Sequence, residues 1–160
     1  MSLTVTCESV PSLDASPLLH YADQPAAKWL MWFPPIGWFL NQSRWQHWAR
    51  PERKKYEATL RERPVIPADT WGSPEQQAIA ASLLTIIDDN FGWPNSRFVP
   101  WDPVAVAMWA YEDGLDDMAA ISDIEKEFAV AFTDEEWLKY YQKTLLDLVD
   151  GILERSERPS

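Results

Sequence analysis

Two helix-start signals, at residues 73–76 and 133–136, limit the fold of this chain more than any other feature. Ser73-Pro74-Glu75-Gln76 joins a capping serine, a proline suited to the first helical position and a glutamine that completes a capping box. Thr133-Asp134-Glu135-Glu136 repeats this pattern later in the chain. After the first signal, Ile79, Leu83 and Ile87 recur every four residues, which places them on one face of a helix. Because no segment alternates convincingly as a strand does, the sequence predicts an all-α fold.

The same signals predict the order of the elements. We expect helices over residues 51–63, 74–91, 113–128, 134–141 and 145–155, with Asp102-Pro103 opening a helical turn through Trp109. Gly92 is the expected glycine stop of the second helix. Residues 92–112 form a long connection whose aromatic side chains suggest that it packs against the helices. The expected apolar face of the helix over 113–128 consists of Leu115, Met118, Ile121, Ile124 and Phe128.

The stretch Asp113-Gly114-Leu115-Asp116, followed by Ile124-Glu125-Lys126-Glu127-Phe128, resembles the modification site and second helix of acyl carrier proteins. The resemblance covers about residues 74 to 155. It implies an acyl-carrier-like four-helix bundle over residues 73–155, preceded by a Trp-rich, mostly irregular or helical N-terminal extension over residues 1–72.

In that family a serine carries the phosphopantetheine arm at the position of Gly114. Glycine has no hydroxyl, so the resemblance implies a carrier fold without carrier chemistry and without a bound cofactor. Ser122, Ser96 and Ser82 do not lie in an Asp-Ser-Leu context, although a carrier modified at another serine stays open as an alternative. Acidic residues of the family's second helix dock on basic partner enzymes. The corresponding partner-binding candidates are Asp113, Leu115, Asp116, Asp117, Met118, Asp123 and Glu125.

The net charge of −11 is unevenly distributed. Residues 74–160 hold 18 acidic and 6 basic side chains, whereas residues 1–73 hold 7 acidic and 8 basic ones. This asymmetry favours a basic protein partner for the second half and argues against nucleic acid, whose phosphates would be repelled. The alternative interpretation is that the acidity only maintains solubility.

The N-terminal extension is rich in tryptophan between residues 29 and 48 and basic between residues 44 and 63. We expect its aromatic side chains to pack on the small helical bundle and enlarge its core. The open alternatives are a membrane interface or a protein partner, for which the candidates are Trp29, Trp32, Phe33 and Trp38. The basic stretch could also lie against the acidic bundle and neutralise part of its charge.

The sequence contains no strong pattern of metal ligands or catalytic residues. His20 and His47 have no ligand spacing between them, and Cys7 has no basic cluster beside it, so we expect neither a metal site nor catalytic residues. An enzyme with a cleft between extension and bundle is the remaining alternative. With one cysteine, no apolar run of ~18 residues and no secretory signal, the sequence predicts a cytoplasmic protein without a transmembrane helix.

Overall fold

The computed structural model describes residues 10–16, 49–95, 97–109 and 115–157, and all structural statements below concern these residues. They contain six α-helices, one 3-10 helix and no strand, which confirms the all-α prediction for the described part. The helices are α4 (Arg50–Glu62), η3 (Ala68–Trp71), α5 (Pro74–Phe91), α6 (Val104–Ala107), α7 (Leu115–Phe128), α8 (Asp134–Tyr140) and α9 (Leu145–Ser156).

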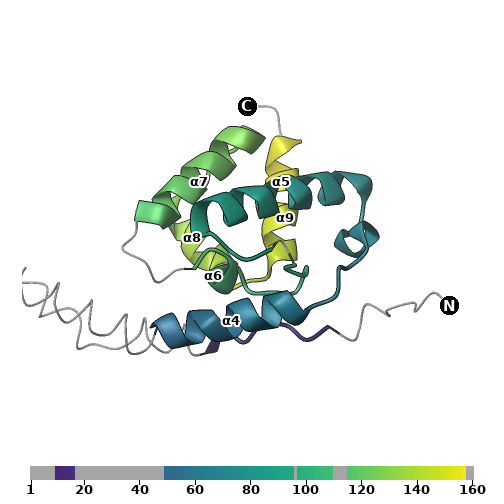
Figure 1. Cartoon of the computed structure of the whole chain (residues 1–160). Helices are drawn as coiled ribbons and strands as arrows, with labels where there is room; N and C mark the ends of the chain where they lie inside the picture. Colours follow the sequence, from purple (N-terminus) through teal and green to yellow (C-terminus); the bar gives the residue numbers. More distant parts are fainter. Residues whose placement is uncertain (1–9, 17–48, 96, 110–114, 158–160) are drawn as a thin grey trace, which may run out of the picture.

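Helix α5 is the centre of the arrangement. It contacts both α7 and α9. Figure 1 shows α5 crossing α9, with α7 and α4 at opposite edges of the molecule. The predicted capping box is present: the Ser73 hydroxyl accepts from the Gln76 backbone N–H (3.3 Å), and the Gln76 amide oxygen accepts from the Ser73 N–H (2.7 Å). Gly92 ends the helix with φ at 60°, a left-handed conformation that glycine adopts without steric cost. Local sequence signals therefore fixed both ends of this helix.

Capping boxes also begin α8 and α9. Thr133 pairs with Glu136 as predicted, and Thr144 pairs with Asp147 in the same way. The backbone N–H of Thr133 is the main cause that lowers the pKa of Glu136. The Thr144 hydroxyl is the main cause that lowers the pKa of Asp147. The two short helices are thus held at their N-termini by charge-assisted hydrogen bonds.

The connection between α5 and α7 packs inward, as its aromatic residues suggested. Trp93, Phe98 and Trp109 are buried, and their rings meet edge to face with the Trp93 centroid 5.5 Å from Phe98 and 5.9 Å from Trp109. The Trp93 indole N–H donates to the Ala107 carbonyl at 2.8 Å. The Arg53 guanidinium from α4 lies over the Trp93 ring at 5.1 Å, a cation–π distance. These contacts join α4 and the connection to one core.

The predicted apolar face of α7 is wrong at one position. Ala120 and Ile124 are buried, whereas Met118 is 69% exposed. Residues spaced three apart advance by 300° rather than a full turn, so each step moves about 60° around the helix. Met118 therefore lies outside the face through which α7 packs, where Ala120 and Ile124 are buried and the predicted Ile121 and Phe128 are partly buried against the core.

A buried ion pair joins parts of the chain that are distant in sequence. The fully buried carboxylate of Asp102 accepts from Arg63 Nη1 (2.5 Å) and Nη2 (2.9 Å). It also accepts from the backbone N–H groups of Leu13 and Val99, both at 2.9 Å. The expectation that Asp102 opens the turn before Trp109 is therefore only partly right. The turn forms as α6, but Pro103 occupies its N-cap position without a side-chain cap, because the Asp102 carboxylate binds elsewhere.

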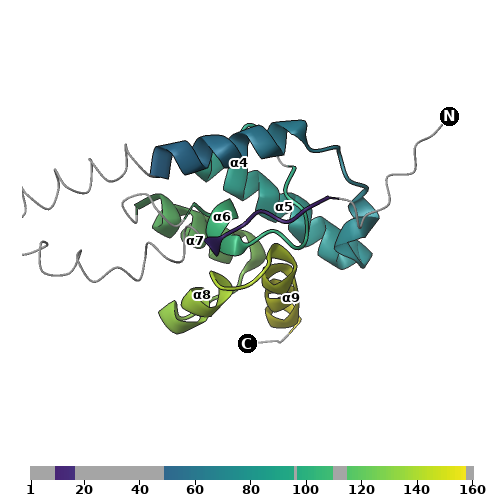
Figure 2. The same ribbon diagram turned by 90° about the horizontal axis from the view of Figure 1, so that it is seen from below.

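The segment over residues 10–16 lies along α4 (Figures 1 and 2) and is tied down by further hydrogen bonds. Arg63 Nη2 donates to the Pro11 carbonyl at 2.6 Å, and the Trp101 indole N–H donates to the Val10 carbonyl at 2.9 Å. The Tyr56 hydroxyl donates to the Asp14 carbonyl at 2.7 Å. Leu13, Tyr56, Leu60 and Trp71 belong to the same cluster of buried side chains as the residues of α5 and α9.

No helix among the described residues has the length and apolar character needed to cross a membrane. The membrane or partner candidates Trp29, Trp32, Phe33 and Trp38 lie outside the described residues.

Candidate functional site

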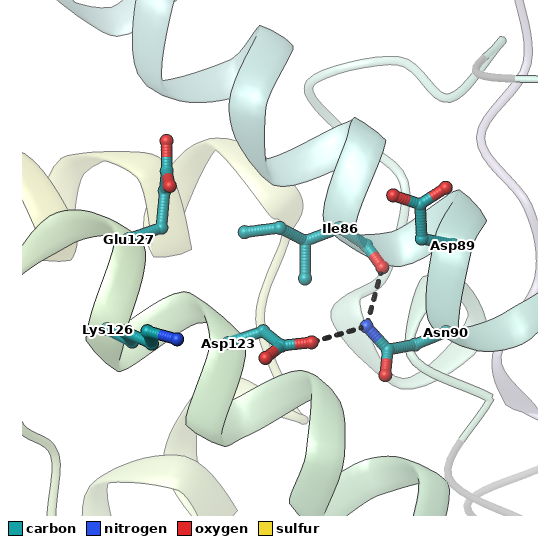
Figure 3. A pocket seen from close by; sticks show the side chains of 6 residues that line it. All are labelled: Ile86, Asp89, Asn90, Asp123, Lys126 and Glu127. Atoms are coloured by element: carbon teal, nitrogen blue, oxygen red, sulfur yellow. Dashed lines mark hydrogen bonds between the residues drawn. The ribbon is translucent and has the colours of Figure 1, made fainter.

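A hollow between α5 and α7 brings acidic side chains from both helices together. It has a volume of about 330 Å³ and is lined by Ile86, Asp89, Asn90, Asp123, Lys126 and Glu127 (Figure 3). The four charged side chains are all exposed to solvent. Three carboxylates against one ammonium group make the rim of this hollow negative.

Asn90 and Asp123 point toward one another across the hollow in Figure 3. The Asn90 amide donates to Asp123 Oδ2 at 3.2 Å and to the Ile86 carbonyl at 3.0 Å. Both bonds hold the Asn90 side chain in one orientation, and the neutral amide leaves the charge of Asp123 uncompensated. The other carboxylate oxygen of Asp123 remains able to accept from a partner.

The predicted partner-binding residues have different places in the structure. Asp123 is exposed at the hollow, and Met118 is exposed one turn and a half earlier on α7. Leu115, Asp116 and Asp117 lie in the first turn of α7. Asp113 and Gly114, the degenerate attachment position, lie outside the described residues.

Glu125 makes an internal contact. Its Oε1 accepts from the Phe132 backbone N–H at 2.9 Å, and this half-buried carboxylate holds the turn that follows α7. In that turn the Glu125 carbonyl accepts from the Val130 N–H at 3.0 Å, and Ala129 has φ at 51°. Glu125 therefore has a structural function whether or not a partner also contacts it.

Sequence reasoning missed the contribution of α5 to this surface. Asp88 and Asp89 are adjacent on one helix, so their side chains point about 100° apart and do not converge on one ligand. The structure instead brings Asp89 together with Asp123 and Glu127 of another helix. The only signal in the sequence was the acidic end of the helix over 74–91, and helix pairing was needed to interpret it.

Within the described ranges, no three His, Cys, Asp or Glu side chains are grouped so that they could hold a metal ion. His20, His47 and Cys7 are not among the described residues. The hollow between α5 and α7 thus offers carboxylates on an open rim, an arrangement suited to cationic side chains rather than to an enclosed ligand.

Comparison with known proteins yields no match to a family model, to a curated protein or to a solved structure.

Proposed function

We propose that this chain is a non-enzymatic protein-interaction module of the cytoplasm that binds a basic partner surface through the acidic side of α7. The observation that carries the proposal is the joint exposure of Asp123 and Glu127 beside Asp89 of α5. Exposed charges of one sign accelerate encounter with a surface of opposite sign and select among partners.

The proposal includes an acyl-carrier-like arrangement for α5, α7, α8 and α9. The order of a long helix, a packed connection, an acidic helix, a short helix and a final helix supports it. Met118 supports it as well, because an exposed methionine on the same helix offers a partner an apolar contact.

Binding is tested with a lysine-rich amphipathic helical peptide as the probe, measured by fluorescence anisotropy at about 0.1 M and about 1 M salt, where the Debye length falls from ~10 to ~3 Å. The variant D123K/E127K should weaken binding about tenfold or more, since it reverses two of the three carboxylates at the hollow. A matched control, D69K/E157K, makes the same charge change at exposed positions outside α5 and α7. Equal binding by the two variants would refute the proposal.

The absence of carrier chemistry has a separate test. Intact mass is measured after incubation with coenzyme A and a promiscuous phosphopantetheinyl transferase, beside a carrier that the enzyme modifies. We expect no added arm because Gly114 has no hydroxyl. A mass gain of one arm would show a working carrier modified at another serine.

A further inference from the structure

Helix α4 carries a row of basic side chains that the fold leaves on its surface. Arg50, Lys54 and Arg61 are exposed, and none of them takes part in the ion pairs found between described residues. Other cations of this segment are held internally: Arg53 pairs with Glu57, and Arg63 pairs with Asp102. At 100° per residue the three exposed cations fall within an arc of about 40°, so they form one line along the helix.

The acidic residues of α7 repeat this spacing in the opposite direction. Arg50, Lys54 and Arg61 are separated by four and seven residues. Glu127, Asp123 and Asp116, read backwards along α7, are also separated by four and seven residues. Two antiparallel helices in this register would place Arg50 beside Glu127 and Lys54 beside Asp123, with the positions of Arg61 and Asp116 continuing the series about 10 Å further on.

The two rows cannot meet within one molecule, because α4 and α7 lie at opposite edges of it (Figure 1). We therefore infer that α4 of one copy docks antiparallel against the α5–α7 hollow of a second copy, so that the basic partner surface is supplied by the chain itself. This inference rests on the proposed function, whose binding surface it uses.

Other anionic partners of α4 fit less well. The basic row is flanked by Pro51 and Ala58 on one side and by the Arg53–Glu57 ion pair on the other, not by the large apolar side chains that an interfacial membrane helix requires. The net charge of −11 opposes approach to nucleic acid. The same net charge repels two copies at long range, but at moderate salt this repulsion is screened beyond ~10 Å whereas pairs in contact persist.

Sedimentation velocity at micromolar to millimolar concentrations tests the inference on the full chain. The protein should associate reversibly in about 0.1 M salt and dissociate in about 1 M salt. Either R50E/K54E or D123K/E127K should weaken self-association about tenfold or more. An equimolar mixture of the two variants should associate again, because each restores the charge pattern that the other has reversed.

The control is the single variant R50E/K54E/D69K/E157K, whose total charge equals the mean of the two mixed variants but whose α4 lacks the basic row. It should remain dissociated. Association of this control as well as of the mixture, or a protein that is monomeric at every concentration, would overturn the inference. So would an R50E/K54E variant that loses binding to anionic lipid vesicles or to duplex DNA while self-association is unchanged.

The two proposals fail separately. A monomeric protein whose Asp123 and Glu127 still bind the lysine-rich peptide would refute self-docking and keep the proposed function. Self-association that survives D123K/E127K, together with unchanged peptide binding by that variant, would refute both.

Discussion

The carboxylates of Asp102 and Asp123 are chemically the same group, but they have opposite surroundings. Asp102 is fully buried and accepts four hydrogen bonds, two of them from the Arg63 guanidinium. Asp123 is exposed and accepts one hydrogen bond from a neutral amide, that of Asn90. A buried charge must be compensated by the fold itself, whereas an exposed charge can be left for a partner. The comparison separates the charges that hold this molecule together from those that are available for recognition.

Removing the buried charge of Asp102 should have the largest effect on stability. Asp102→Asn leaves the buried Arg63 guanidinium without a counter-charge, and we expect a loss of about 3–5 kcal/mol in the free energy of unfolding. Urea denaturation measures this loss. Asp123→Asn is the matched control, with an expected change within about 0.5 kcal/mol. Similar losses of stability for the two variants would contradict the distinction between the buried and the exposed carboxylate.

A hydrogen bond between two uncharged groups should contribute less to stability than the buried ion pair does. Tyr56→Phe removes the hydroxyl that donates to the Asp14 carbonyl, at an expected cost of about 1 kcal/mol. Burial, with smaller contributions from Glu52 and Asp14, raises the pKa of Tyr56 to about 12. The fold therefore favours the neutral phenol, so this contribution is complete below the ordinary pKa of 10.0 and is lost as the pH rises from there toward about 12.

Urea unfolding at several pH values above 9 measures this loss. The wild-type protein should lose stability more steeply over that range than the Phe variant, which has no phenol at position 56 to titrate. Parallel pH profiles would contradict the pKa assigned to Tyr56.

The half-exposed carboxylate of Glu136 lies between the two extremes. Its pKa is lowered by the backbone N–H of Thr133 and, to a smaller extent, by its hydrogen bonds with the Thr133 hydroxyl and its ion pair with Arg155. The stability from this group is present above its ordinary pKa of 4.5 and is lost as the pH falls through the lower pKa of the folded state. Glu136→Gln should therefore show a smaller decrease in melting temperature than the wild type between neutral pH and about pH 3. An identical decrease would assign acid sensitivity to other carboxylates, among them Asp147.

Reversing the exposed charges of Asp123 and Glu127 should change stability least. D123K/E127K should remain within about 0.5 kcal/mol of the wild type in urea denaturation, since both side chains are exposed and only Asp123 has an internal bond. A loss above about 1.5 kcal/mol would mean that the α5–α7 surface helps to hold the fold together, and the binding experiments would then need a more conservative variant such as D123N/E127Q.

The sequence predicted what depends on neighbours along the chain. Ser73, Thr133 and Thr144 begin helices where expected, because a cap and its partner are three residues apart. It could not predict the ligands of Asp102, which come from Leu13, Arg63 and Val99, since their convergence depends on how α4 and the connection pack. The same limit applies to the candidate site. Asp123 was predicted from α7 alone, whereas Asp89 and Asn90 join it only through the pairing of α5 with α7.

The bond between Leu13 and Asp102 spans 89 residues. At synthesis rates of ~5–20 residues per second, Leu13 is synthesised about 4–18 seconds before the carboxylate that accepts its hydrogen bond. During that interval Leu13, which is buried in the finished protein, has no complete core to enter. The N-terminal segment is therefore the first part of the described structure to be synthesised, and its hydrogen bond to Asp102 can form only after most of the chain has been made.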